Sequence, residues 1–361
     1  MSKVANRTVT FINNTSGSAI TSEELDLNTC FGDNEIVIKI RAAALNPVDL
    51  IIQNFAFSWL VNKEPKTYSR DYSGDVVKVG KNVENFKIGD KVCGLYAHIF
   101  GRQGTLGDYL ILDPTKKCAI EQMPRFDDPK YSDYVLNAAW PLVFGTAHRA
   151  LFGYGQKLGP ESQILVIGAS TSVSTALVQI AKNYLRVGTV VGICSQKSFE
   201  YNRTLGFDHL VAYDGDKDVV SQVTELIEGE LDHKKFDLVF DSVGNDSFFP
   251  KLDDVLKDKN ENSYYMTVVG DRKLNYTNVS KWEALKPKRE MLKRYGPFRK
   301  YNYATVLTQE NAAFVKLGCE LISQKKYAPV IDSVHEIENY TNAFERLLSN
   351  RAKGKVVVEI N

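Results

Sequence analysis

The chain has 361 residues, enough for two domains, and its 45 lysines and arginines nearly balance 44 aspartates and glutamates, which argues against a nucleic-acid partner. Its five cysteines are odd in number and far apart, without a C-x-x-C pair, which excludes a disulfide framework and a cysteine-rich zinc site. The sequence shows no run of about 18 apolar residues and no signal-peptide core, so we expect a soluble cytoplasmic protein.

The first 140 residues are rich in strand signals. Residues 35–40 alternate polar and apolar side chains, as in a half-buried strand. Residues 73–80 are an extended run flanked by turn glycines, and residues 87–92 form a turn that leads into a strand. We therefore predict a strand-rich catalytic domain that begins with residues 1–140.

Strands alternate with helices from residue 141 to residue 306. The apolar run 164–167 predicts a strand buried on both faces, and apolar side chains spaced three and four apart over 173–185 predict a helix after it. Further strands are expected at 189–193, 209–213, 236–240 and 264–269. Such repeats build a parallel sheet, so residues 141–306 are predicted to be an α/β, doubly wound Rossmann domain.

The last segment, residues 307–361, is predicted to return to the catalytic domain. Residues 311–324 have a helical pattern, and residues 351–358 read as a turn followed by a strand. The Rossmann domain would then be inserted between the two parts of the strand-rich domain.

The segment between the first Rossmann strand and its helix is Gly-Ala-Ser-Thr-Ser-Val-Ser, residues 168–174. Backbone N–H groups at such a helix start can hold a pyrophosphate, normally beside a G-x-G-x-x-G pattern. One glycine of that pattern is present here, and small hydroxyl residues replace the others. The predicted cofactor contacts are Gly168, Ser170, Thr171, Ser172 and Val173. The alternative is an ordinary N-capped helix.

Two other strand ends are candidate ligand sites, because open α/β sheets bind ligands beyond the carboxyl ends of their strands. They carry Ser242 and Val243 after one strand and Val269 and Gly270 after the next. We predict that these four residues contact the cofactor.

The end of the second Rossmann strand indicates which nicotinamide cofactor is used. NAD-binding domains usually carry a carboxylate there, whereas this chain has Ser195 and Lys197 nearby. A hydroxyl and an ammonium group could bind a 2′-phosphate, so the sequence favours NADPH. The alternative is that Lys197 is only a solvated lysine.

Seven segments recur in a fixed order in one known family and span almost the whole chain. They are AAALNPVD (42–49), RDYSGDVV (70–77), VxxFKIGDKVCG (83–94), AAWPLVFGTA (138–147), VQIAK (178–182), FDxVxDSVG (236–244) and GKVVV (354–358). By these segments the chain resembles the zinc-free quinone oxidoreductases of the medium-chain dehydrogenase/reductase superfamily. It most resembles the fungal YIM family, which has the same Gly-Ala-Ser-Thr-Ser-Val-Ser turn.

The resemblance implies a GroES-like catalytic domain around the Rossmann domain, NADPH in the cleft between them, and hydride transfer to a quinone, an α,β-unsaturated carbonyl or a related aldehyde. It also implies a homodimer, and it adds Thr146, Tyr213 and Lys353 to the cofactor site. Asn46 is the first candidate for positioning the nicotinamide amide and the substrate oxygen. Tyr72 is the second catalytic candidate, and core packing is the alternative for its ring.

A catalytic zinc ion is not expected. Alcohol dehydrogenase relatives that bind zinc need an early cysteine, where this chain has Asn-Pro-Val-Asp at 46–49. The five histidines are isolated from one another and from the cysteines; they are His98, His148, His209, His233 and His335. We therefore predict metal-free chemistry.

Residues 281–301 are locally basic, with aromatic residues interleaved. This segment is interpreted as a lid, as a weak membrane-surface contact, or as a solvated helix or dimer-edge loop. The fungal resemblance implies lipid-droplet or mitochondrial association as an alternative to the cytoplasm, although no targeting peptide is seen. A catalytically silent NADPH-binding sensor or scaffold at a lipid surface is the alternative function, because the turn lacks glycines.

Overall fold

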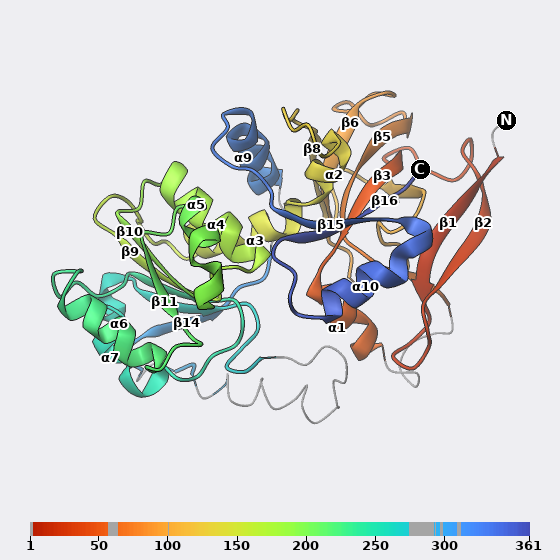
Figure 1. Cartoon of the computed structure of the whole chain (residues 1–361). Coiled ribbons are helices and arrows are strands. Elements are labelled where there is room, and N and C mark those ends of the chain that lie inside the picture. Colours follow the sequence, from red (N-terminus) through yellow and green to blue (C-terminus); the bar gives the residue numbers. More distant parts are fainter. Residues whose placement is uncertain are drawn as a thin grey trace. The chain divides into compact units, whose positions relative to one another are not determined.

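The computed structural model of the chain describes residues 3–56, 64–99, 101–273, 292, 294–296, 299–308 and 312–361. The chain divides into two compact units (Figure 1). Unit 1 is Met1–Gly145 with Glu310–Asn361, and unit 2 is Thr146–Gln309. Unit 2 is therefore inserted in the sequence of unit 1.

The described residues of unit 1 form two β-sheets and several helices. Its elements are β1 (Lys3–Phe11), β2 (Ala19–Asp26), β3 (Ile36–Leu45), α1 (Pro47–Phe55), β4 (Lys66–Thr67), β5 (Asp71–Val79), β6 (Lys91–Tyr96), β7 (Tyr109–Leu112), β8 (Cys118–Gln122), α2 (Asp133–Ala138), α9 (Ala312–Ser323), β15 (Ile331–Glu336), α10 (Tyr340–Leu348) and β16 (Lys355–Glu359). Helix α3 (Pro141–Phe152) begins in unit 1 and ends in unit 2.

The larger sheet of unit 1 has the order β15-β16-β3-β5-β6-β8, and β7 also pairs with β3. The last strand, β16, pairs antiparallel with β3, so the end of the chain joins the sheet of the N-terminal segment. Strand β3 is longer than predicted and is buried more completely than alternation suggested, since Val37 is buried as well as Ile36 and Ile38. Strands β16, β5 and β7 all pair with β3, which makes it an interior strand of this sheet.

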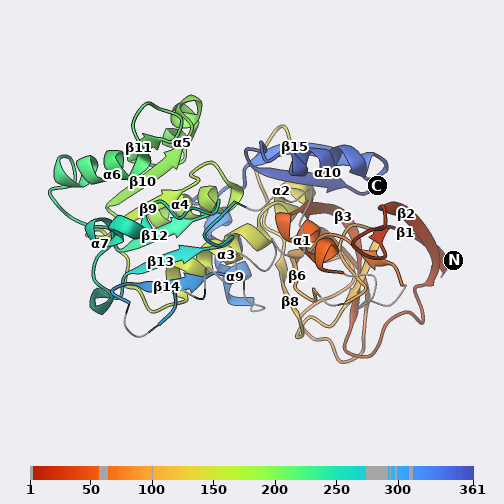
Figure 2. The same ribbon diagram turned by 90° about the horizontal axis from the view of Figure 1, so that it is seen from below.

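The described residues of unit 2 form one six-stranded sheet. Its elements are β9 (Gln163–Ile167), α4 (Ser172–Asn183), β10 (Thr189–Cys194), the 3₁₀-helix η1 (Gln196–Ser198), α5 (Phe199–Thr204), β11 (His209–Ala212), α6 (Val219–Glu228), β12 (Leu238–Asp241), α7 (Leu252–Val255), β13 (Tyr264–Thr267) and β14 (Asn302–Thr305). The strands lie in the order β11-β10-β9-β12-β13-β14, as Figure 2 shows.

All pairings in the sheet of unit 2 are parallel, and the strand order reverses between β9 and β12. This is the doubly wound topology, so the predicted Rossmann fold class is confirmed. Strand β9 is buried along its whole length, and α4 buries the face that carries Ala176, Leu177 and Ile180. The parallel sheet places the residues after β9 and β12 side by side at one edge.

Candidate functional site

The turn after β9 requires a glycine at residue 168. Gly168 has φ of 87°, a left-handed conformation that side chains disfavour. A Cβ atom there would lie 2.5 Å from Val243 Cγ1 and 2.6 Å from Ser242 Oγ. The predicted residues Gly168, Ser242 and Val243 are therefore in direct proximity, and the turn is packed against the end of β12.

Hydroxyl groups hold this turn where glycines are normally found. The Thr171 hydroxyl lies 2.9 Å from both Ser174 Oγ and Ser242 Oγ, and Ser174 Oγ lies 3.0 Å from Ser242 Oγ. The Ser242 hydroxyl donates to the carbonyl of Ile167 at 2.9 Å. Ser174 is completely buried, and the Ser242 hydroxyl provides the hydrogen-bond partner that its buried hydroxyl needs.

The first turn of α4 retains donors for an anion. Thr171 caps the helix by accepting from the Ser174 N–H, but the Ser172 and Val173 N–H groups donate to no other group in the described part of the chain. Both residues are only partly buried. Their N–H groups, the positive end of the helix dipole and the glycine at 168 fit the diphosphate of a dinucleotide. The Ser170 hydroxyl accepts from Asn202 Nδ2 at 2.9 Å.

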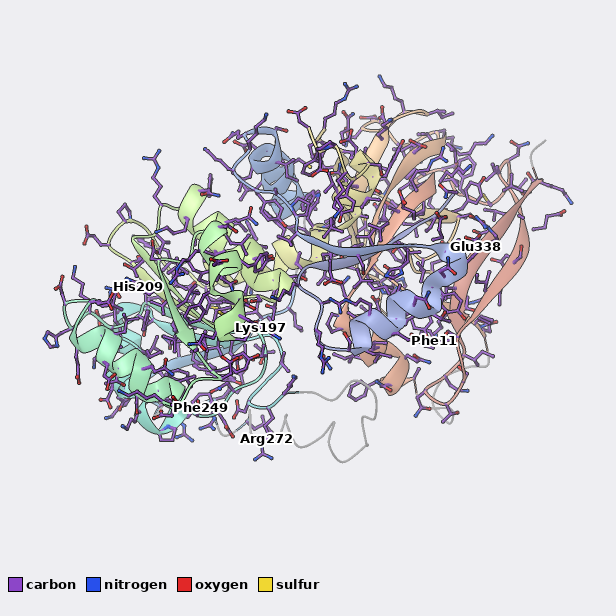
Figure 3. The ribbon with its side chains drawn as sticks, in the orientation of Figure 1. Phe11, Lys197, His209, Phe249, Arg272 and Glu338 are labelled. Carbon is purple, nitrogen blue, oxygen red and sulfur yellow. The ribbon has the colours of Figure 1, made fainter. Side chains whose placement is uncertain are left out.

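The residues predicted to recognise a 2′-phosphate lie at the ends of β10 and β11. These strands are parallel neighbours, and the Tyr213 N–H donates to the Cys194 carbonyl at 3.1 Å, which places Ser195 and Tyr213 at one edge. Ser195 is buried and its hydroxyl lies 3.0 Å from Ser198 Oγ, whereas Lys197 is exposed (Figure 3).

Sequence reasoning missed a carboxylate at this edge. Asp214 Oδ1 accepts from the backbone N–H of Gln196 at 2.8 Å, next to Lys197. The aspartate comes from the end of the third strand rather than the second, so the usual rule for an NAD-binding carboxylate does not find it. Its negative charge opposes a 2′-phosphate, while Lys197 favours one.

Three other predicted residues of unit 2 lie on α3 or after β13. Val269 and Gly270 follow β13, where both N–H groups donate to Thr267 Oγ1. Thr146 lies on α3, and its hydroxyl is 2.6 Å from Thr308 Oγ1. Their contact with a cofactor stays a prediction.

Asn46 of unit 1 lies in a buried polar cluster and its carboxamide is almost fully used. Its Nδ2 donates to Asp71 Oδ2 at 2.8 Å and to the Ala44 carbonyl at 3.2 Å, and its Oδ1 accepts from Lys355 Nζ at 2.5 Å. A carboxamide has two N–H donors, so neither is left for a substrate oxygen. Donation from Asn46 to a substrate oxygen, one part of its predicted role, does not fit these hydrogen bonds. The other part, contact with the nicotinamide amide, is compatible with them, because one lone pair on Oδ1 remains to accept from an N–H donor.

Lys355 and Asp71 form a completely buried ion pair. Lys355 Nζ lies 2.9 Å from Asp71 Oδ2, and the two side chains are 3% and 0% exposed. Asp71 Oδ1 also accepts from the backbone N–H of Leu142 at 2.7 Å. Lys355 is therefore the lysine that reaches Asn46. Lys353, predicted as a cofactor contact, is exposed and its backbone N–H donates to Asp332; its contact with a cofactor stays a prediction.

Asp49 belongs to the same cluster and is buried with one oxygen unpartnered. Its Oδ2 accepts from the Asn46 N–H at 2.8 Å, and its Oδ1 has no hydrogen-bond partner among the described residues. Burial raises the pKa of Asp49 to about 6, although Arg70 opposes the shift. This is the cost of placing a carboxylate with an unsatisfied oxygen inside the domain.

Replacing Asp49 with asparagine is expected to reduce the pH dependence of stability. A folded pKa of about 6, above the unfolded value of about 3.9, means that the folded chain takes up the proton first as pH falls. The group therefore stabilises the fold progressively below pH 6, by about 1 kcal/mol between pH 7 and pH 5. Urea unfolding at both pH values measures this gain in stability. The exposed control Glu84→Gln should show the same gain as the wild type. If Asp49→Asn also showed the full wild-type gain, Asp49 would not be its source.

Tyr72 is a core residue in the structure. Its side chain is 0% exposed, and its hydroxyl has no hydrogen-bond partner in the part of the chain that the structure describes. A Cβ atom on Gly94 would lie 3.0 Å from that hydroxyl. Burial also raises the pKa of Tyr72 well above its ordinary value. These observations support core packing, the alternative stated for this residue, rather than a catalytic role.

The other sequence-based predictions concern a metal, a membrane and a basic segment. Among the residues that the structure describes, no group of three His, Cys, Asp or Glu side chains is placed to hold a metal ion. The helices in that part of the chain are all too short or too polar to cross a membrane. The basic segment 281–301 lies largely outside the described residues, so its lid and membrane interpretations stay predictions.

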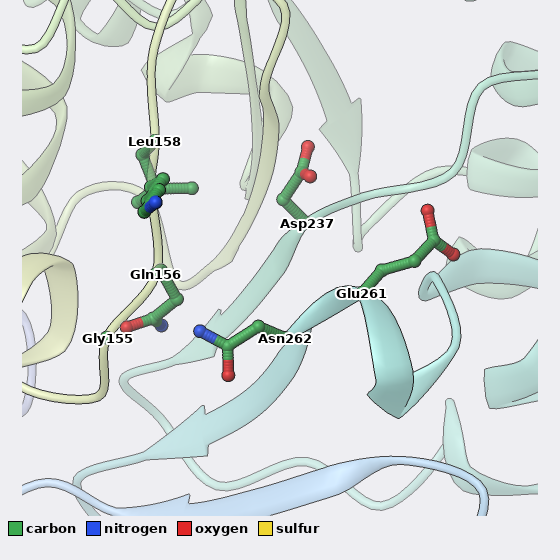
Figure 4. Close-up of a pocket in the computed structure, with 7 residues that line it drawn as sticks. Gly155, Gln156, Leu158, Asp237, Glu261 and Asn262 are labelled. Carbon is green, nitrogen blue, oxygen red and sulfur yellow. The ribbon is translucent and has the colours of Figure 1, made fainter.

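A pocket of about 230 Å³ lies elsewhere in unit 2 (Figure 4). It is lined by Gly155, Gln156, Lys157, Leu158, Asp237, Glu261 and Asn262. These residues precede β9, β12 and β13, so the pocket lies at the amino ends of the strands, away from the glycine turn. It is therefore distinct from the predicted cofactor site.

Comparisons with known proteins agree with this architecture. Residues 32–122 match the alcohol dehydrogenase GroES-like domain, and residues 205–358 match the zinc-binding dehydrogenase family. The chain is 59% identical over 358 residues to protein YIM1-1 of Lachancea thermotolerans, which covers 99% of each chain. It is 49% identical over 361 residues to protein YIM1 of Saccharomyces cerevisiae, which covers 99% of this chain and 98% of that one.

A solved structure shares the fold over the full length of the chain. The quinone oxidoreductase from Coxiella burnetii has a TM-score of 0.74 and 20% identity, with 99% of this chain and 100% of that chain covered. The GroES-like and parallel-sheet domains, the order of the motifs and the high identity to the fungal proteins point the same way. The chain belongs to the YIM family of the medium-chain dehydrogenase/reductase superfamily, an oxidoreductase superfamily whose members use nicotinamide cofactors.

Proposed function

We propose that the protein is an NADPH-dependent reductase of quinones, α,β-unsaturated carbonyls or related aldehydes. The observation that carries this proposal is the turn after β9. Gly168 has a conformation and surroundings that admit no side chain, and the Ser172 and Val173 N–H groups beside it are available to an anion. The inward-facing hydroxyl cluster gives the turn the close packing that glycines usually provide.

Each unit supplies part of the proposed chemistry. A bound reduced nicotinamide would supply a hydride for the β-carbon of an enone or for a quinone. Residues of unit 2 would hold the diphosphate through the first turn of α4 and the adenosine 2′-phosphate through Lys197 and Ser195. In unit 1, the remaining lone pair of Asn46 Oδ1 would accept from the carboxamide N–H, with Lys355 and Asp71 fixing its direction.

Binding and turnover measured on the same preparation test the proposal. NADPH titrated into the purified full-length protein should bind more tightly than NADH, and NADPH oxidation should follow when a quinone, an enone or an aldehyde is added. Failure to bind either cofactor would overturn the proposal.

A catalytically silent NADPH-binding protein is the second candidate. One observation favours it: neither predicted catalytic side chain presents a donor to solvent, because both N–H groups of Asn46 are used and the Tyr72 hydroxyl is completely buried. Tight NADPH binding without turnover on the whole substrate panel would select this second function.

Lys197 and Asp214 are expected to set the choice between NADPH and NADH. The variant Lys197→Met should weaken NADPH binding about tenfold, since a charge-assisted contact to phosphate is lost, and should leave NADH binding almost unchanged. Asp214→Asn should strengthen NADPH binding, because it removes a negative charge next to Lys197 and keeps an acceptor for the Gln196 N–H.

Dissociation constants for both cofactors measure this preference. Lys234→Met, at an exposed lysine outside the predicted site, is the matched control and should change neither constant. Equal losses for NADPH and NADH in Lys197→Met would show that this lysine does not recognise the 2′-phosphate.

A further inference from the structure

Asn202 is a completely buried polar residue on α5 that contacts two loops of unit 2. Its side-chain nitrogen, Nδ2, lies 2.9 Å from the carbonyl oxygen of Ser198 and 2.9 Å from Ser170 Oγ. Ser198 ends η1, which follows β10, whereas Ser170 lies in the turn after β9. One carboxamide therefore joins the loop assigned above to the 2′-phosphate to the turn assigned to the diphosphate.

The contact with Ser198 fixes the direction of both hydrogen bonds. A carbonyl oxygen only accepts, so the Asn202 atom beside it is the nitrogen of the carboxamide and not its oxygen. An amide nitrogen only donates, so the Ser170 hydroxyl oxygen accepts the second N–H of Asn202. The hydrogen of the Ser170 hydroxyl cannot point back at Asn202 and is left for another acceptor.

Ser170 presents two donors beside the first turn of α4. Within the described part of the chain, neither its hydroxyl hydrogen nor its backbone N–H is donated to any acceptor. Ser170 is partly exposed, whereas Asn202 is completely buried, so a ligand can reach the serine but not the asparagine. The hydroxyl of Ser170 thus joins the backbone N–H groups that are available to an anion at this turn.

The Asn202 carboxamide is kept in the core although one end of it is unsatisfied. Its oxygen, Oδ1, has no hydrogen-bond partner among the residues that the structure describes, which is unfavourable for a buried carbonyl group. A leucine has a similar size and shape and would not bury that oxygen. The two N–H donors are therefore what an asparagine contributes at this position, and one of them acts on Ser170.

We propose that Asn202 is a positioning residue that fixes the Ser170 hydroxyl as a hydrogen-bond donor to the diphosphate of the cofactor. The inference rests on the proposed function and deepens it, because it brings α5 into the recognition of the diphosphate. A hydroxyl whose lone pair already accepts an N–H has its hydrogen oriented before the ligand arrives, so less rotational freedom is lost on binding. The accepted hydrogen bond also polarises the O–H group and strengthens its donation to an anion.

A double-mutant cycle in cofactor binding tests this role. NADPH is titrated calorimetrically into the full-length wild type, Ser170→Ala, Asn202→Leu and the double variant. Ser170→Ala should raise the dissociation constant about tenfold, because one charge-assisted hydrogen bond is lost. Asn202→Leu should raise the constant about fivefold when Ser170 is present, and less than about twofold when residue 170 is already alanine, because Asn202 acts through that hydroxyl.

Two further variants separate positioning from a general effect on the fold. Ser170→Thr keeps the hydroxyl and should therefore keep most of the affinity that Ser170→Ala loses. Thr204→Val removes a hydroxyl from an exposed position of the same helix and should leave the dissociation constant unchanged. If Asn202→Leu does not fold, Asn202→Asp replaces it in the cycle. Its carboxylate would accept from the Ser170 hydroxyl, so its effect should again be larger when Ser170 is present.

The outcomes of the cycle distinguish this inference from the proposed function. If the losses of the two single variants multiply in the double variant, Asn202 does not act through Ser170 and the proposal is overturned. Wild-type affinity in Ser170→Ala would overturn it as well, because the hydroxyl would then not contact the diphosphate. In both cases NADPH still binds to the wild type and the proposed function stands, whereas a wild type that binds no NADPH removes both.

Discussion

The variant Lys355→Met is expected to lower the free energy of unfolding by about 3–5 kcal/mol, the range found when one partner of a buried ion pair is removed. Lys355 and Asp71 are almost completely shielded from water, so the Asp71 carboxylate would lose its only cationic partner shown in the described structure. Asn46 would lose its Oδ1 donor at the same time. Urea unfolding monitored by tryptophan fluorescence measures the loss.

The design of this experiment separates charge from packing. Lys353→Met, two residues away at an exposed position, should change stability by less than about 0.5 kcal/mol. The double variant Asp71→Asn with Lys355→Met should recover part of the loss, because it leaves no buried unpaired charge. A loss below about 1 kcal/mol in the single variant would show that the pair contributes little.

Replacing Gly168 with alanine is the second change with a large expected effect. The left-handed backbone costs roughly 1–2 kcal/mol for a residue with a Cβ atom, and contacts of 2.5 Å and 2.6 Å to Val243 and Ser242 add overpacking of about 1–3 kcal/mol. The turn must shift to relieve both, and the Ser172 and Val173 N–H groups shift with it. We expect NADPH affinity to fall at least about tenfold.

Gly159→Ala is the matched control for this prediction. A Cβ atom on Gly159 meets nothing within 4 Å, and the position lies in the same unit. Calorimetric titration with NADPH should therefore give the wild-type constant for Gly159→Ala. Wild-type affinity in Gly168→Ala, at a temperature where that variant is folded, would remove the turn from the cofactor site.

The Rossmann half could be predicted because its pattern is local and repeated. A strand buried on both faces, such as β9, is a continuous apolar run, and α4 shows its buried face at helical spacing. These patterns follow from the burial of each element and need no knowledge of distant partners. The limits of the strands differed by a few residues, as at β12, which begins at Leu238.

The site was harder to predict because its partners are distant in sequence. Ser174 and Ser242 are 68 residues apart, so the local sequence does not show the partner of Ser174. The turn by itself therefore resembles a nucleotide-binding motif that has lost its glycines. Lys355 and Asp71 are 284 residues apart, and a lysine before three valines gave no sign of a buried counterion. The local signal that could have identified Lys355 in place of Lys353 is a charged residue that opens an otherwise buried strand.

The hydroxyl cluster changes how relatives of this chain should be searched for a nucleotide site. A fingerprint of three glycines identifies a turn whose inner side carries no side chains. Here the inner side carries hydroxyl side chains that hydrogen-bond to one another. Position 242, directly after strand β12, thus becomes part of the fingerprint. A relative with serine or threonine at 171 and 174 would keep this architecture only if residue 242 still offers an oxygen.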